Sequence, residues 1–334
     1  MSLRVAVAAG HFGRDVAFNL RRIEAIVHEA ATAEVDLLVL PHGALTGYHD
    51  HLAGDDPAPD APPGPGSARS RAAAADTGVA AGRTAPSGPG PAAGEAPAPG
   101  LGPGSAPELP AAVRVDGPEV AAVSTTIAGA GRDLVVCFGI TEDVAGERAN
   151  TAVCVDGQGF LGLHRKVHLP AGEVAWYRAG DGFEPVATPV GRIGLLVDYD
   201  KTFPESARCL ALDGAEILVC TCAWPASRTN RARSLVRDRQ RRLFDLYDRS
   251  RAAENQLWLM SANQIGRHGM LRFLGQSKVV RPDGEIVASV GARAGLAVAD
   301  IDVAAGVDHA RRRFHHLKER RPDLYRQLGD SGPA

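Results

Sequence analysis

The chain lacks a dominant charge of either sign and lacks any long apolar run. Its 334 residues carry 37 basic and 39 acidic side chains, which are interspersed and leave a net charge of −2. A nucleic-acid partner favours a basic surface, and a membrane span needs about 20 consecutive apolar residues. The opening residues, MSLRVAVAAG, run straight into a predicted strand without the basic and apolar regions of a secretion signal. The sequence therefore predicts a cytoplasmic protein without a nucleic-acid or membrane partner.

Cysteine is also scarce. The five cysteines show neither the spacing of a disulfide framework nor that of a structural metal site. Cys220 and Cys222 lie two positions apart on a predicted strand, so their side chains are expected on the same face. We interpret the cysteines as reduced thiols, and we expect neither a metal nor a cofactor.

A central segment has almost no aromatic or large aliphatic residues. Between about residues 55 and 110 the sequence consists mainly of alanine, proline and glycine. Such a composition cannot bury a hydrophobic core, and a surface insertion costs little stability. We therefore predict a disordered loop inserted into a single domain that spans residues 1–334.

Outside this segment, predicted strands alternate with predicted helices, which is the pattern of an α/β domain. Strands are expected at 5–9, 37–40, 134–139, 152–155, 193–197 and 216–221, and helices at 16–32, 206–213 and 228–251. The last of these is rich in arginine with interspersed leucine and phenylalanine. That pattern predicts an amphipathic helix with a basic face.

The most informative position is Asp198. It follows a short apolar run of the kind that forms a fully buried strand, and Pro204 suits the first turn of the next helix. A strand-to-helix elbow exposes one side chain above the sheet and aims backbone N–H groups at whatever is attacked. The sequence thus places a carboxylate where a nucleophile is expected.

Long segments carry a resemblance to a known family. IGLLVDYDKTFPESARCLALDGAEILV resembles the nucleophile segment of the carbon-nitrogen hydrolase (nitrilase) superfamily, in which a cysteine stands where this chain has Asp198. LPHGALTGY is similar to a family motif with glutamate after the proline, a position held here by His42. LHRKVHLPAGEVAWYRAGDGF resembles the segment of the catalytic lysine, which falls on Lys166, and Glu173 matches a second, substrate-positioning glutamate. RSRAAENQLWLMSANQIG and GQSKVVRPDGEIVASV resemble later family segments.

The resemblance implies a fold and an assembly. Members of the superfamily form a four-layer α-β-β-α sandwich, and two sandwiches pair into an eight-layer dimer. We therefore expect this architecture, a small-molecule substrate and a homodimer or higher homo-oligomer.

The resemblance also implies an altered site. Family members combine a glutamate base, an oxyanion-stabilising lysine and an attacking cysteine. Of these only Lys166 is retained, so thiol hydrolysis should be absent or much reduced. We interpret His42, Lys166, Glu173 and Asp198 as a cluster for acid–base chemistry on a small nitrogen-containing or carbonyl compound. Lys166 is expected to keep both carboxylates ionised, and a neighbouring carboxylate to keep His42 partly protonated.

Alternatives stay open for this site. The cluster could be a plain ion pair in a catalytically silent subunit that binds a ligand or a partner protein. A relocated thiol such as Cys222 could instead carry out amidase chemistry. A metal could be bound by the histidine and the two carboxylates of the cluster, although Lys166 would repel it.

Further residues receive supporting roles. Tyr199, Cys222 and Trp224 are expected to contact the substrate. His49 and His51 are expected to be solvated residues beside the insertion. The residues Glu254, Asn255 and Asn263 are expected to support the pocket walls by hydrogen bonding.

Overall fold

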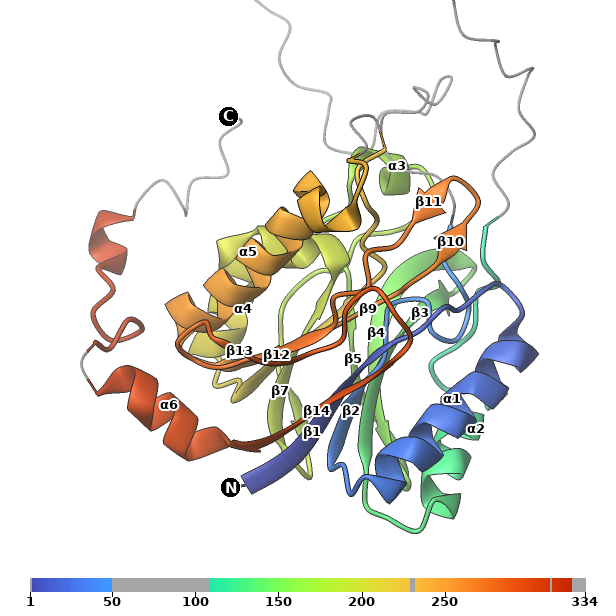
Figure 1. Ribbon diagram of the computed structural model, residues 1–334, viewed down its shortest axis with the longest axis horizontal. Helices are drawn as coiled ribbons and strands as arrows, with labels where there is room; N and C mark the ends of the chain where they lie inside the picture. The colour runs from blue at the N-terminus through green and yellow to red at the C-terminus, as the bar shows by residue number, and fades with distance from the viewer. Residues whose placement is uncertain (1, 50–108, 229–231, 313, 326–334) are drawn as a thin grey trace, which may run out of the picture. The chain divides into compact units, whose positions relative to one another are not determined.

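The computed structural model describes residues 2–49, 109–228, 232–312 and 314–325 (Figure 1). The predicted loop at about 55–110 lies outside these residues, apart from Leu109 and Pro110. No helix in this described part of the chain is long and apolar enough to cross a membrane.

The first sheet of the described chain has six strands in the order β14-β1-β2-β3-β4-β5. These strands are β1 (Ser2–Ala9), β2 (Leu37–Val39), β3 (Val135–Val144), β4 (Glu147–Asp156), β5 (Gly159–Arg165) and β14 (Gly295–Asp302). The pairs β1–β2 and β2–β3 are parallel, whereas β14, β4 and β5 pair antiparallel with their neighbours. The carboxyl ends of β2 and β3 therefore lie at one edge of the sheet.

The second sheet has the order β13-β12-β9-β8-β7-β6 within the same described residues. Its strands are β6 (Val186–Thr188), β7 (Gly191–Val197), β8 (Ile217–Cys222), β9 (Trp258–Asn263), β12 (Lys278–Val280) and β13 (Ile286–Ser289). β7, β8 and β9 are parallel neighbours, so the residues that follow them meet at one edge. β10 (Arg267–His268) and β11 (Leu271–Arg272) form a separate short pair.

Helices cover the outer face of each sheet (Figure 1). Helices α1 (Val16–Thr32) and α2 (Pro118–Gly129) pack with the first sheet, and α4 (Pro204–Leu212) and α5 (Arg239–Asn255) pack with the second. A separate apolar cluster fills the space between the sheets, with β7 and β8 residues such as Leu195 and Val219 against β1 and β3 residues. Burial of these apolar faces is the main favourable term in the folding of such layers. The predicted four-layer α-β-β-α sandwich is confirmed.

Shorter elements complete the described chain. They are α3 (Ala171–Val174), α6 (Val303–Arg311) and the 3₁₀ helices η1 (Asp198–Thr202), η2 (Leu235–Arg237) and η3 (Pro322–Leu324). The expected helix at 16–32 matches α1 at both ends, and the carboxylate of Asp15 accepts a hydrogen bond from Phe18 N–H at its start.

The predicted helix at 228–251 is wrong in its extent. Helix α5 begins at Arg239, because the carboxylate of Asp238 accepts a hydrogen bond from Gln240 N–H and caps the helix there. Leu235 belongs to η2 instead. The apolar pattern is also only partly on the buried face, since Phe244 is buried whereas Leu246 is exposed.

Candidate active site

The candidate site begins at the carboxyl end of β7. Asp198 follows Val197 there and opens the 3₁₀ turn η1, so a 3₁₀ turn separates the strand from helix α4, which starts at Pro204. Asp198 has a φ of +44°, in the left-handed region that few residues other than glycine adopt, although asparagine and aspartate do so more often than most. Such a conformation costs about 1–3 kcal/mol and persists where surrounding contacts over-determine it.

Asp200 supplies contacts of this kind. Its carboxylate accepts hydrogen bonds from the N–H groups of Val197 and His168, and it lies 2.9 Å from Nε2 of His164. These bonds outweigh the cost of burying Asp200 and hold its pKa below the ordinary value. Asp200 therefore remains ionised and fixes the turn on both sides of Asp198.

The carboxyl group of Asp198 has two unlike oxygens. Oδ1 accepts a 2.6 Å hydrogen bond from Ala223 N–H, whereas Oδ2 is buried and has no hydrogen-bond partner within the described residues. Burial raises the pKa of Asp198 to about 6, although the Lys166 ammonium opposes this rise. Asp198 is therefore still largely ionised at pH 7, as expected, but its pKa lies above the ordinary value because desolvation outweighs the attraction of Lys166.

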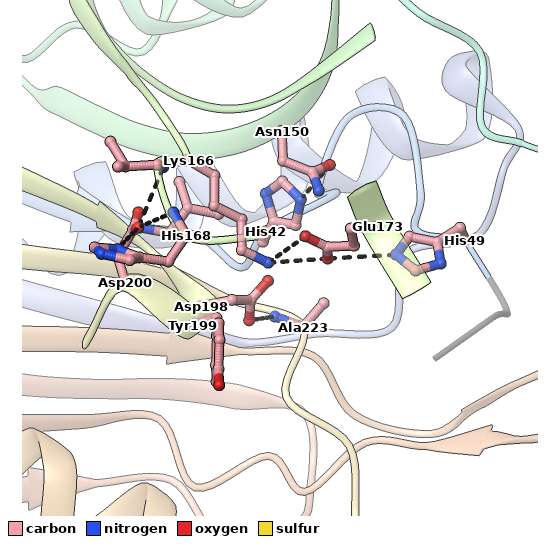
Figure 2. Close-up of polar contacts among 12 residues, drawn as sticks. His42, His49, Asn150, Lys166, His168, Glu173, Asp198, Tyr199, Asp200 and Ala223 are labelled. Carbon is pink, nitrogen blue, oxygen red and sulfur yellow. Dashed lines mark hydrogen bonds and ion pairs between the residues drawn. The ribbon is translucent and has the colours of Figure 1, made fainter. Parts of the chain in front are cut away.

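Lys166 and Glu173 form a buried ion pair beside Asp198 (Figure 2). Lys166 Nζ lies 2.9 Å and 2.7 Å from the two carboxylate oxygens of Glu173. Burial opposes ionisation of Glu173, but the Lys166 charge and a hydrogen bond from His49 lower its pKa to about 2. The expectation that Glu173 is ionised is confirmed.

Two residues that follow the His42 loop also reach Glu173. Tyr48 Oη donates a 2.7 Å hydrogen bond to Glu173 Oε1, and His49 Nε2 lies 3.4 Å from the same oxygen. His49 is buried, so its expected role as a solvated residue is wrong, whereas His51 lies outside the described residues. The loop turns back sharply at Gly43, which has a φ of +67° and lies where a Cβ would be 2.4 Å from Gly47 O.

His42 lies in the same buried region but in a different state from the one expected. Its Nε2 is 3.2 Å from Asn150 Oδ1, and its Nδ1 lies where a Cβ on Gly139 would be 2.4 Å away. Burial and the Lys166 charge lower the pKa of His42 to about 3, so the ring is neutral at pH 7. The expected partly protonated histidine is wrong, because burial and the Lys166 charge outweigh the opposing effect of the Glu173 carboxylate.

The three residues expected to contact substrate have different environments. Tyr199 is 37% exposed and in Figure 2 points away from Lys166 and Glu173. Cys222 is fully buried in the apolar layer between the second sheet and its helices, with Sγ 3.4 Å from Cys220 Sγ, and its side chain lies outside the charged cluster. The Trp224 ring packs in the same layer against Phe244. The expected shared face of Cys220 and Cys222 is confirmed.

The predicted framework residues do form hydrogen bonds. Asn263 Oδ1 accepts from Trp224 N–H, and its Nδ2 donates to the carbonyl groups of Trp224 and Gly275. Asn255 Nδ2 donates to Arg251 O, and Glu254 accepts from the Arg251 guanidinium. Asn263 thereby links the segment that follows β8 to the segment that precedes β12. The first of these segments also contains Ala223, whose N–H group binds Asp198.

The sequence reasoning missed a second set of buried charges near this site. The chain contains only four lysines, and three of them, Lys166, Lys201 and Lys278, are buried. Long cationic side chains are almost never fully buried unless they are paired. The scarcity of lysine in an arginine-rich chain was therefore a usable signal for Lys201 and Lys278.

No group of three or more histidine, cysteine, aspartate or glutamate residues suited to a metal ion occurs in the part of the chain that the structure describes. A surface cavity of about 400 Å³ lies between α2 and the β4–β5 turn, but its lining includes none of the cluster residues. We therefore locate the candidate site by its converging charged groups and not by cavity size.

The comparisons with known proteins define the family. A model described as carbon-nitrogen hydrolase matches residues 4–308, so the chain belongs to the carbon-nitrogen hydrolase family. A protein described as a hydrolase in the pqqF 5′ region of Pseudomonas protegens is 29% identical over 320 residues, covering 94% of this chain and 87% of that protein.

Amidases and a nitrilase are among the other relatives. The N-carbamoylputrescine amidase of Solanum tuberosum is 31% identical over 58% of this chain and 68% of its own length. The human deaminated glutathione amidase is 36% identical over 54% of this chain, and the match spans 55% of its length. A probable nitrilase of Schizosaccharomyces pombe is matched over 62% of its length.

Solved structures agree with the fold. A carbon-nitrogen hydrolase from Helicobacter pylori G27 gives a TM-score of 0.73 at 21% identity and covers 99% of both chains. A glutamate-to-glutamine mutant of an amidase from Nesterenkonia carries an acetamide moiety on its active-site cysteine. It gives a TM-score of 0.64 at 20% identity, and the match covers 97% of this chain and 96% of the amidase chain.

Proposed function

We propose that this protein hydrolyses a carbon–nitrogen bond of a small amide or carbamoyl compound, using Asp198 to activate water instead of a thiol to attack the substrate. The observation that carries the proposal is the Asp198 carboxyl group itself. One oxygen is fixed by Ala223 N–H, the other is buried and has no hydrogen-bond partner among the described residues, and the group lies beside the Lys166 ammonium. The family's known members that resemble the chain include amidases.

In the proposed reaction, Asp198 acts as the general base. Its carboxylate accepts a proton from a water molecule as the water oxygen bonds to the carbonyl carbon of the substrate. Lys166 stabilises the negative charge that develops on the carbonyl oxygen. The protonated Asp198 then returns the proton to the leaving nitrogen as the carbon–nitrogen bond breaks, which releases an acid and an amine and regenerates the carboxylate.

The pKa of Asp198 supports this role. A general base works best when its pKa lies near the working pH, because it is then largely ionised and still basic enough to accept a proton. A value of about 6 meets both conditions at pH 7. An ordinary aspartate, with its lower pKa, would be a weaker base.

The other members of the cluster take passive roles in this proposal. Glu173 stays ionised at a pKa of about 2 and orients Lys166 through two contacts. His42 is neutral and held by Asn150, so it takes no part in the proton transfer. It serves as a buried hydrogen-bonding residue that shapes the wall behind Lys166.

A second candidate is a catalytically silent subunit that binds a small ligand or a partner. The observation that favours it is the internal pairing of the site, since Lys166 bonds both carboxylate oxygens of Glu173 and one oxygen of Asp198 bonds Ala223 N–H. Amidase chemistry through Cys222 ranks below both, because that thiol belongs to the packed layer behind β8.

The test is a hydrolysis screen on primary amides, N-carbamoyl amines and ureido acids, with release of ammonia or amine as the readout. We expect Asp198→Asn to lower turnover at least about 100-fold, the scale of a lost general base. The matched control is Asp213→Asn, which makes the same chemical change at an exposed position and should leave turnover unchanged.

Other outcomes separate the alternatives. Turnover that survives Asp198→Asn and disappears in Cys222→Ala would overturn the assignment in favour of the thiol. An acyl adduct on Asp198, detected by intact mass after acid quench, would identify the carboxylate as a nucleophile. Tight ligand binding without turnover in the wild type and in both variants would favour the silent subunit.

A further inference from the structure

Behind the Asp198 turn lies a second buried charge network that the proposed chemistry does not use. Lys201, three residues after Asp198 in η1, is fully buried, and its Nζ donates a 2.7 Å hydrogen bond to Asp248 Oδ1 of helix α5. Lys278 of β12 lies 3.1 Å from the other oxygen of Asp248 and 2.7 Å from Asp245. The two ammonium groups lie 3.3 Å and 4.1 Å from the centre of the Phe244 ring.

Helix α5 holds the turn at two points one helical turn apart. Asp248 binds the side chain of Lys201, and Arg251, three residues later on the same helix face, binds its backbone. Arg251 Nε donates to the carbonyl oxygen of Lys201 at 2.8 Å, and its Nη2 donates to that of Thr202 at 3.0 Å. The guanidinium fork thus holds two successive carbonyl groups of η1.

We propose that Lys201 is a positioning residue for Asp198, anchored by Asp248 and Arg251 so that the turn keeps its left-handed Asp198 and a second cation stands behind the carboxylate. The inference rests on the proposed function, because it gives the reacting carboxylate its conformation and its electrostatic setting. Lys201 itself contacts Asp248, Ser261 and aromatic rings, so it does not act on substrate.

The charges around Asp198 make the electrostatic part testable. The ionisable groups that face its carboxylate are Tyr48, Lys166, Glu173 and Lys201. Burial opposes a charge on Lys201, but Asp248 outweighs it and raises the pKa of the ammonium. Removing a permanent cation near a carboxylate favours its neutral form, so the loss of Lys201 should raise the pKa of Asp198.

The experiment is an NMR titration of the full-length protein labelled with ¹³C at aspartate side chains, in which Asp198 is assigned by its absence in Asp198→Asn. Lys201→Met should raise the Asp198 midpoint by about half a pH unit or more, less than the one to three units of a directly contacting charge. Lys201→Arg, which keeps the charge, should restore a midpoint close to the wild type. Lys318→Met, the same change at an exposed lysine, should leave it unchanged.

The titration reports on Asp198 whether or not the protein hydrolyses any compound, so it fails independently of the proposed function. An unchanged midpoint in Lys201→Met, or an equal shift in the Met and Arg variants, would overturn the proposal. If Lys201→Met cannot fold with Asp248 paired to Lys278 alone, the double variant Lys201→Met with Asp248→Asn removes both charges. Because Asp248 is not among the groups that face the Asp198 carboxylate, the double variant should still show a raised midpoint. A double variant that cannot fold counts against the proposal, since the pair would then serve the core alone.

Discussion

Oδ1 of Asp198 accepts a 2.6 Å hydrogen bond from the N–H group of Ala223, which follows β8, the strand beside β7. This bond aligns one edge of the carboxyl group with the neighbouring segment and leaves the other oxygen, Oδ2, as a buried acceptor. A single backbone donor and the Lys166 charge are not enough to offset burial, so the carboxyl group titrates near pH 6. The site therefore contains a carboxylate that is costly to ionise at neutral pH.

This cost predicts that Asp198→Asn stabilises the protein while it inactivates it. The folded-state pKa of about 6 lies above the ordinary value of 3.8, so the contribution of Asp198 to stability is fully present below about pH 4 and is lost as the pH rises through 6. Asparagine tolerates the left-handed backbone and can still accept the bond from Ala223 N–H. In urea unfolding, the free energy of unfolding of the variant should exceed that of the wild type by about 1–3 kcal/mol at pH 8, and by less at pH 5. A variant less stable than the wild type at pH 8 would contradict this.

Whereas Asp198 makes the protein less stable as the pH rises, His42 should make it less stable as the pH falls. Its folded-state pKa of about 3 lies below 6.5, so its contribution is present above about pH 6.5 and is lost as the pH falls towards 3. Between pH 7 and pH 5 this loss amounts to about 2 kcal/mol for the wild type. His42→Gln retains an amide that can bond Asn150 and does not titrate, so its free energy of unfolding should fall by about 2 kcal/mol less over the same range. Urea titrations of both proteins at the two pH values measure this difference. An equal change in the free energy of unfolding for both proteins would exclude a neutral buried His42.

The Lys166–Glu173 pair should show strong coupling. Removing one member leaves the other as a buried charge, which costs about 3–5 kcal/mol in other proteins. Glu173 keeps Tyr48 as a donor, so Lys166→Met should be the milder single change and should raise the pKa of Glu173. The double variant Lys166→Met with Glu173→Gln should recover part of the loss, giving a coupling energy of about 1–3 kcal/mol in a urea-based double-mutant cycle. Additive single effects would show that the two groups do not depend on each other.

The fold could be predicted from the sequence because its signals are local and repeated. The apolar run at 193–197 gives a buried strand of the predicted type, and the periodic segment at 16–32 gives α1. The start of helix α5 was predicted wrongly, because the arginine-rich pattern extends to both sides of Asp238 whereas the helix begins only after this capping residue. The resemblance supplied the layer order, which no periodicity contains.

The members of the site were predictable, but their protonation states were not. Sequence motifs placed Lys166, Glu173 and Asp198 together, and the structure brings these side chains into one buried cluster. Whether attraction or desolvation dominates depends on burial and on the number of donors, which are properties of the folded chain. Among the described residues, Glu173 receives three side-chain donors and its pKa is lowered, whereas Asp198 receives one backbone donor and its pKa is raised. Lys201 was missed because its partner, Asp248, lies on another element 47 residues away.

The family resemblance implies a homo-oligomer, and exposed apolar side chains on the outer helices give that expectation a location. Leu212 at the end of α4 and Leu246 on α5 are 50% and 56% exposed, and the two helices are neighbours on the outer face of the second sheet. A contiguous exposed apolar patch marks a protein–protein contact, and we expect Leu212 and Leu246 to contribute to one. We expect the wild type, whose chain mass is 34.9 kDa, to run as a dimer or larger species in light scattering, and Leu246→Glu to shift it to the monomer mass. Phe160→Glu places the same charge at an exposed site on the first sheet and should leave the assembly intact. Leu246→Glu should dissociate the assembly because a glutamate buried at an interface has to be desolvated without a partner. A monomeric wild type would exclude the contact, and dissociation by Phe160→Glu alone would place it elsewhere.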